Sequence, residues 1–167
     1  GSPWYVKGIA RQESGLQNGR YYCQFNEIGA LGPAWDDIRY CPNFGTPNGW
    51  GIMQRDPPVN EETLWNWKTN IAQGKNWIDT CRDFAAAWIN EQKRQQQEED
   101  PSQPLSAQTF VIGGVQFREG TSRTPIDACT INRYNGATKW VIYWRNKTSE
   151  LPGAWCMRED YAGYVQD

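Results

Sequence analysis

The chain has 167 residues, a formal net charge of −2 and a pI of about 5.3, and it is long enough to bury the core of one domain. Lys and Arg are scattered along it, which excludes the clustered basic surface of a nucleic-acid-binding protein, and no apolar run reaches the roughly 18 residues of a membrane span. Gly1 and Ser2 are typical of a cloning remnant. Since no signal peptide follows them, we expect residues 3–167 to form a single domain taken from a longer protein.

Histidine is absent, which narrows the chemistry that the chain can perform. Nucleophiles of the Ser-His-Asp and Cys-His types are excluded, and so are zinc sites built on histidine. No CxxC pair replaces such a site among the five cysteines, which are Cys23, Cys41, Cys81, Cys129 and Cys156. We therefore expect no metal and no cofactor, and carboxylates are the best candidates for acid–base chemistry.

Residues 3–13 are predicted to form a helix, because Val6, Ile9 and Ala10 recur on one face with helical spacing. Glu13 falls in the last turn of this helix. The helix dipole disfavours a negative charge at that end, so the position favours a carboxyl group that keeps its proton. From these residues alone, a solvated surface glutamate is the simpler interpretation of Glu13.

The connection 20–48 is rich in Gly, Pro, Asn and aromatic residues, and it contains Asp36 and Asp37. A loop of this length in a compact domain is usually functional or held together by a covalent link. Cys23 and Cys41 bracket a polar part of the loop, so a disulfide is one interpretation and buried free thiols are the other. Because the number of cysteines is odd, at least one of them stays unpaired within the chain.

The segment 49–56 reads Gly-Trp-Gly-Ile-Met-Gln-Arg-Asp and ends at two prolines. Glycines let the backbone come close to a ligand or to another element. Gln54 offers a donor and an acceptor, and Asp56 offers a charge. Alone, this is a moderately specific signal, and the simpler interpretation of Asp56 is a turn residue before Pro57.

The remainder is predicted to be mainly helical, with one hairpin. A long helix is expected over 70–98, with Cys81 as a core thiol and a polar end from Gln92 that projects into solvent. The other expected elements are a short helix over 61–67, a hairpin over 108–118 that turns at Gly113-Gly114, a helix over 125–132 closed by Gly136, a helix or strand over 139–145, and a last helix from about Trp155 or Arg158 to the end.

Four short motifs occur in a characteristic order. They are Arg11-Gln12-Glu13-Ser14, Gly49 to Gln54, Asn70-Ile71-Ala72-Gln73-Gly74 and Arg133-Tyr134-Asn135-Gly136-Ala137. Together they resemble the Glu-Ser, Gly-Leu-Met-Gln, Asn-Ile-x-x-Gly and Ala-Tyr-Asn-Ala-Gly pattern of the goose-type lysozyme and soluble lytic transglycosylase superfamily. Glu159-Asp160-Tyr161-Ala162 is similar to a run in the final helix of goose-type lysozymes. The resemblance spans most of the chain, with 20–48 and 91–125 as insertions. It implies a mainly α, lysozyme-like domain with a small β-hairpin in an insertion.

The resemblance assigns roles to individual residues. Glu13 matches the catalytic acid, which protonates the glycosidic oxygen. The candidate substrate-binding residues are Ser14, Trp50, Met53, Gln54, Tyr134 and Asn135. The departures from the family pattern are Ile52 for Leu, and Arg133 and Gly136 for Ala, and we expect none of them to touch the chemistry.

Asp56 bears on which of two reactions the chain performs. Goose-type lysozymes resemble this chain in having an Asp separated by one residue from the Met-Gln pair, and their acidic residues position a water on the far face of the sugar ring. In an inverting enzyme the two carboxyl groups lie about 6.5–9.5 Å apart, which leaves room for that water. Transglycosylases instead use the sugar's own 6-hydroxyl and leave an anhydro end. The family has a second aspartate a little upstream of the Gly-rich motif, but residues 45–49 of this chain contain no carboxylate. Asp37 or Asp36 could take the role of that aspartate if the loop folds back. Hydrolysis is favoured and transglycosylation stays open.

The function that the resemblance implies is cleavage of the β-1,4 bond between N-acetylmuramic acid and N-acetylglucosamine in peptidoglycan. The alternative classes are a non-catalytic glycan-binding module and a docking domain with a Trp-rich surface. We expect a monomeric domain whose partner is the glycan strand, and an inhibitor or immunity protein is compatible with this interpretation. Action in the bacterial cell wall or periplasm is implied, with delivery by a parent protein such as a secreted effector or a phage component.

Overall fold

The computed structural model describes residues 3–14, 25–26, 41–42, 44–45, 49–55 and 60–158. Its described part is mainly helical, and its strands form two-stranded antiparallel sheets. This confirms the predicted fold class, a mainly α chain with a small β-hairpin. The chain divides into two compact units, one up to Trp77 and one from Ile78 onward, and each is described by itself. The expectation of one domain over 3–167 stays a prediction.

The first unit begins with helix α1, Tyr5–Ser14. Ile9 and Ala10 are buried, as the apolar spacing predicts, whereas Val6 is only partly buried and Tyr5 joins the core instead. The helix starts two residues later than expected, at Tyr5. Pro3 belongs to a turn that precedes it, in which Val6 N donates to Pro3 O at 3.2 Å. Glu13 and Ser14 are the last two residues of the helix.

Two short sheets and a short helix complete this unit before the long helix. Strand β1, Phe25–Asn26, pairs with β2, Cys41–Pro42, and β3, Phe44–Gly45, pairs with β4, Gly49–Trp50. Helix α2, Glu61–Trp65, is capped by Asn60, whose Oδ1 accepts from Thr63 N at 2.8 Å.

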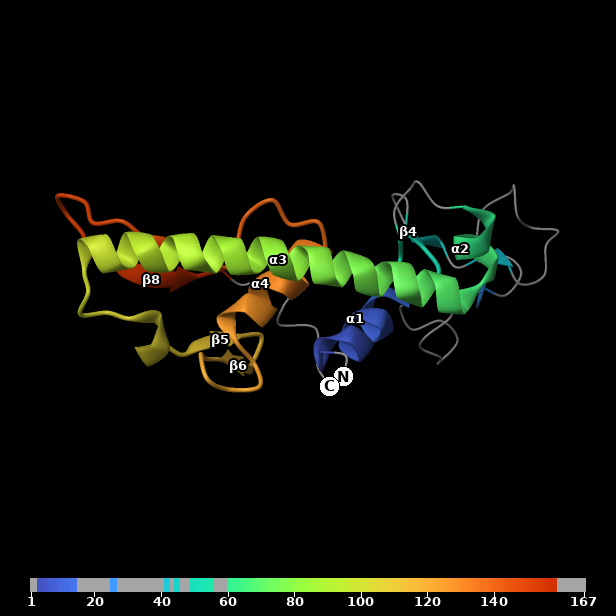
Figure 1. Ribbon diagram of the computed structural model, residues 1–167, viewed down its shortest axis with the longest axis horizontal. Coiled ribbons are helices and arrows are strands. Elements are labelled where there is room, and N and C mark those ends of the chain that lie inside the picture. The colour runs from blue at the N-terminus through green and yellow to red at the C-terminus, as the bar shows by residue number, and fades with distance from the viewer. Residues whose placement is uncertain are drawn as a thin grey trace. The chain divides into compact units, whose positions relative to one another are not determined.

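Helix α3, Trp67–Glu99, begins directly after Asn66 and continues from the first unit into the second (Figure 1). The predicted helix over 61–67 is therefore too long at its end, since Asn66 adopts an extended conformation. Asn66 closes α2 and its Oδ1 accepts from Lys68 N at 3.0 Å, which starts the new helix. Among the described residues, no helix combines the length and apolarity that a membrane span requires.

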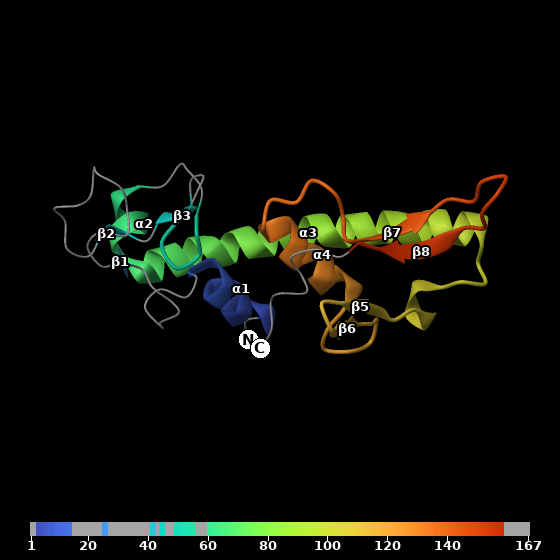
Figure 2. The same cartoon turned by 180° about the vertical axis from the view of Figure 1, so that it is seen from behind.

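In the second unit, α3 buries a stripe that includes Ile78, Cys81, Ala85 and Ile89. The expectation that the helix becomes polar all round from Gln92 and projects into solvent is wrong. Gln92 and Gln96 continue the buried stripe, each with 3% of its surface exposed. The reason is a hairpin that lies along this half of α3 in both views of the chain (Figures 1 and 2).

That hairpin consists of β7, Ile142–Arg145, and β8, Ala154–Met157. The segment 139–145, undecided from sequence, is thus partly a strand. The helix predicted from Trp155 is wrong over 155–157, because the backbone of these residues pairs with β7. Residues 159–167, which include the predicted remainder of that helix, lie outside the described residues.

A second hairpin and a helix precede it. Strands β5, Phe110–Ile112, and β6, Val115–Phe117, are joined by two glycines with positive φ, which confirms the predicted hairpin. The 3-10 helix η2, Leu105–Ala107, leads into it. Helix α4, Pro125–Tyr134, begins with a capping box between Thr124 and Asp127 and ends before Gly136, as predicted, at φ 77°.

The described cysteines with placed side chains are Cys81, Cys129 and Cys156, and all three are free thiols. This confirms Cys81 as a core thiol. The predicted alternatives for Cys23 and Cys41 concern side chains outside the described residues.

Burial raises the pKa of the Cys129 thiol to about 12, which predicts a loss of stability in alkali. An unfolded thiol ionises near pH 8.5, so this group's contribution is complete below that pH and declines as the pH rises toward 12. Between these values, the free energy of unfolding should fall more steeply for wild type than for Cys129→Ala, by up to about 1.4 kcal/mol per pH unit. Denaturant titrations at several pH values measure both slopes. Equal slopes would contradict the prediction.

Candidate functional site

The second motif folds into a tight turn over residues 50–55, the motif turn. Trp50 N donates to Arg55 O at 3.1 Å, and Arg55 N donates to Trp50 O at 2.9 Å, which closes it. Gly51 has φ 73° and Gln54 has φ 44°, and Gln54 is the one non-glycine residue with positive φ in the described part of the chain. A non-glycine residue in this region stores backbone strain, and such strain is concentrated at functional sites.

The Gln54 side chain folds back over the motif turn. Its Nε2 donates to Gly51 O at 2.8 Å. A Cβ atom at Gly49 would lie 2.6 Å from Gln54 Oε1 and 2.9 Å from Gln54 Cβ, so only glycine fits at position 49 in this arrangement. Gly49 therefore leaves room for the Gln54 side chain, and the Gln54 amide nitrogen stabilises the motif turn through its hydrogen bond to Gly51 O.

Asn70, in the first turn of α3, joins the third motif to the second. Its side chain is buried, and its Oδ1 accepts from Met53 N at 2.8 Å. Its Nδ2 donates to Trp50 O at 2.8 Å and more weakly to Thr63 O at 3.4 Å. One side chain thus holds the motif turn and the end of α2 on the start of α3.

Gly74 lies one helical turn further along and packs against Met53. Met53 has none of its surface exposed, so in this structure it fills the space beneath the motif turn. A Cβ atom at Gly74 would lie 2.6 Å from both Cβ and Cγ of Met53. The predicted substrate contact of Met53 stays a prediction, and its observed role is packing.

Gly74→Ala is expected to destabilise the first unit by about 1–3 kcal/mol through this clash. Alanine is otherwise the better helix former by about 1 kcal/mol, so a loss of stability would isolate the steric effect. Denaturant unfolding of the variant measures it. Combining Gly74→Ala with Met53→Gly, which removes both Cβ and Cγ of Met53, should cost less than the sum of the two single changes. Additive costs would show that the two residues are not packed as described.

Glu13 and Ser14 lie in the first unit at the C-terminal end of α1. Ser14 has 1% of its surface exposed, and Glu13 is partly buried. Trp50, on β4 beside the motif turn, is also partly buried.

Tyr134 and Asn135 belong to the second unit, at the end of α4. Tyr134 has 8% of its surface exposed, whereas Asn135 is exposed as the C-cap residue. Their relation to Glu13 stays a prediction. Asp37 and Asp56, the candidates for placing water, lie outside the described residues, and so does the stretch 159–162.

The structure adds roles that sequence reasoning did not assign. The predicted site residues do not include Asn70, Gly74 or Arg55. Arg55 Nε is buried with no hydrogen bond, and its guanidinium lies 5.7 Å from the centroid of the Trp77 ring. The motif spacing was a signal for Asn70 and Gly74, but no sequence signal pointed to Arg55. Among the described residues, no cluster of acidic or cysteine side chains could hold a metal ion.

Comparisons with protein-family models, with curated proteins and with solved structures find no match for this chain. The family resemblance therefore depends on the order of the four motifs. In the structure, the second and third motifs are in contact, through the hydrogen bonds of Asn70 to the motif turn and the packing of Gly74 on Met53.

Proposed function

We propose that this chain is a peptidoglycan glycan-strand hydrolase, with Glu13 as the general acid. It cleaves the β-1,4 bond between N-acetylmuramic acid and N-acetylglucosamine. The observation that carries the proposal is the joining of two motifs that are far apart in sequence. Asn70 bonds to Met53 and Trp50 from 17 and 20 residues away, and Gly74 fits against Met53. Chance matches to a family pattern would have no reason to interlock in this way.

The chemistry needs a proton on the leaving oxygen and stabilisation of an oxocarbenium-like centre. Glu13, which is partly buried at the C-terminal end of α1, supplies the proton. In the proposal, Asp56 and Asp37 place the attacking water. Trp50, Gln54, Tyr134 and Asn135 bind the sugars, while Met53 and Ser14 support the site from within the core.

The test is mass spectrometry of the soluble products released from purified peptidoglycan. We expect muropeptides with a reducing muramic end, which identify water as the nucleophile. Products lighter by one water would carry an anhydro end and would replace hydrolysis by lytic transglycosylation, leaving Asp56 without a catalytic role. Binding to peptidoglycan with no release of products would overturn the enzymatic proposal and favour a non-catalytic module.

The same proposal places the activity in the bacterial cell wall or periplasm, where the glycan strand is found. The chain would act there as a domain of a larger secreted effector, phage component or wall-remodelling enzyme. Its net charge of −2 indicates that it does not rely on bulk positive charge to reach an anionic wall.

A further inference from the structure

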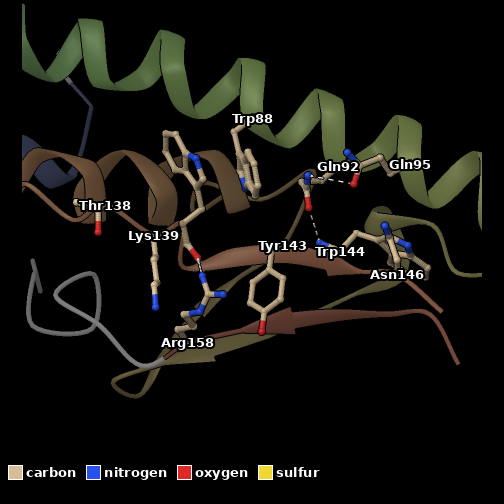
Figure 3. A pocket seen from close by; sticks show the side chains of 10 residues that line it. Trp88, Gln92, Gln95, Thr138, Lys139, Tyr143, Trp144, Asn146 and Arg158 are labelled. Carbon is tan, nitrogen blue, oxygen red and sulfur yellow. Dashed lines mark hydrogen bonds between the residues drawn. The ribbon is translucent and has the colours of Figure 1, made fainter. Parts of the chain in front are cut away.

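The second unit contains a pocket of about 550 Å³, a volume typical of small-molecule sites. It lies between the C-terminal half of α3 and the β7–β8 hairpin (Figure 3). Four aromatic, four neutral polar and two cationic side chains line it, and no carboxylate does so among the described residues. The motif residues of the proposed active site are not part of this lining.

A pair of stacked indoles provides the apolar wall. The rings of Trp88 and Trp140 are 5.6 Å apart between centroids and inclined by only 15°. Trp88 Nε1 donates to Ile142 O at 2.9 Å, which fixes the plane of that indole relative to the hairpin. A rigid aromatic face of this kind matches the flat C–H face of a pyranose ring.

Side-chain amides provide the neutral polar wall. Gln92 is buried and its Oε1 accepts from Trp144 N at 2.8 Å, whereas its Nε2 reaches Gln95 Oε1 only at 3.5 Å (Figure 3). The Asn146 side chain is exposed and makes no hydrogen bond to another described residue. Amides with remaining donor and acceptor capacity suit hydroxyl and acetamido groups.

Two cations set the charge of the pocket. Arg158 Nη1 donates to Trp140 O at 2.8 Å, and its guanidinium lies 4.2 Å from the Tyr143 ring centroid, which holds it in place (Figure 3). Lys139 is exposed. Neither cation forms an ion pair with a carboxylate in the part of the chain that the structure describes. The lining therefore favours an anionic ligand.

We propose that this pocket binds a pyranose sugar that carries a carboxylate. The indoles take the face of the ring, the amides take its polar edge, and Arg158 and Lys139 take the carboxylate. A cationic ligand is disfavoured because no lining carboxylate would pair with it. The inference stands on this pocket and does not require that Glu13 be catalytic. Two sources share the chemistry, an N-acetylated muramic sugar and a uronic acid.

The experiment is an NMR titration of the ¹⁵N-labelled wild-type chain, monitored at the indole N–H resonances. The ligands are two matched pairs, N-acetylmuramic acid with N-acetylglucosamine, and glucuronic acid with glucose. These monosaccharides contain no bond for the proposed enzyme to cut, so failure here is distinct from failure of the proposed function. We expect at least one acid to bind with a Kd of about 1–10 mM. Its neutral counterpart should bind at least about fivefold more weakly, a difference that about 1 M NaCl should remove.

The acid that binds identifies the source, and either acid supports the proposal. Lys139→Gln should weaken binding of that acid about threefold to tenfold while leaving the neutral sugar unaffected. Lys147→Gln is the matched control, since it removes the same charge from the same unit outside the pocket. Four results would overturn the proposal: no saturable shift of the Trp88 or Trp144 resonances, equal affinities for acid and neutral sugar, equal effects of the two lysine variants, or shifts confined to Trp65 and Trp67.

Discussion

Glu13→Gln is expected to lower the rate of muropeptide release by about 10²–10⁴-fold, the usual contribution of a positioned general acid. Glutamine keeps the size and polarity of the side chain but has no carboxyl proton to give to the leaving oxygen. The fold should be retained, because Glu13 lies in the last turn of α1, where removing a negative charge relieves an unfavourable interaction with the helix dipole. The measurements are product release by mass spectrometry and the thermal unfolding midpoint of the same samples.

Glu61→Gln provides the control for this variant. Glu61 is exposed in the first turn of α2, in the same unit, and is not among the predicted site residues, so Glu61→Gln makes the same chemical change at a position without a predicted role. We expect it to keep the wild-type rate. If Glu13→Gln retained more than a few per cent of that rate, Glu13 would not be the acid. If it unfolded, Glu13 would have a structural role and the loss of activity would say nothing about proton transfer.

Helices and hairpins with a clear period were predictable from the sequence. The apolar faces of α1 and α3 follow a 3.6-residue repeat, and the β5–β6 hairpin is marked by alternation around two glycines. Strand β8 was not predictable, because a segment of only four residues is too short to show a period of its own. Its pairing with β7 decides its conformation, as is common for short strands.

The burial of Gln92 has the same origin. A run of polar residues at the end of a helix predicts exposure, yet the neighbouring hairpin covers Gln92, and the backbone N–H of Trp144 donates a hydrogen bond to Gln92 Oε1. A polar side chain can be buried when a backbone group of another element satisfies it, and sequence periodicity does not contain that information.

The candidate site shows a similar limit. Motif order was enough to select Met53 and Gln54 as site residues, and it marked Asn70 only as a member of the third motif. The division of labour among them follows from backbone geometry, since Gln54 has a positive φ, Met53 points into the core, and Asn70 bonds to main-chain atoms. A motif therefore predicts that residues act together before it predicts which of them touches a ligand.

Asn70→Leu is expected to cost about 2–4 kcal/mol, because it leaves the buried Met53 N–H without an acceptor and removes the second donor to Trp50 O. The amide proton of Met53 should be protected from hydrogen exchange in wild type and lose that protection in the variant. Asn90→Leu, at an exposed position of the same helix, is the control and should change stability by less than about 0.5 kcal/mol. Wild-type stability and exchange in Asn70→Leu would mean that Asn70 does not hold the motif turn.

Asn70→Asp separates the two halves of this interaction. The substituted carboxylate keeps an acceptor for Met53 N but has no donor for Trp50 O and Thr63 O, and it places a buried charge against two carbonyl oxygens. We expect a larger loss of stability than in Asn70→Leu at neutral pH. Burial raises the pKa of such a carboxyl, so the loss should shrink as the pH falls toward about 4, where protonation restores one donor. A loss of stability that is independent of pH between about 4 and 7 would mean that the carboxylate at position 70 is not penalised by burial against the two carbonyl oxygens. That result would contradict the proposed role of the Asn70 Nδ2 donor in holding the motif turn.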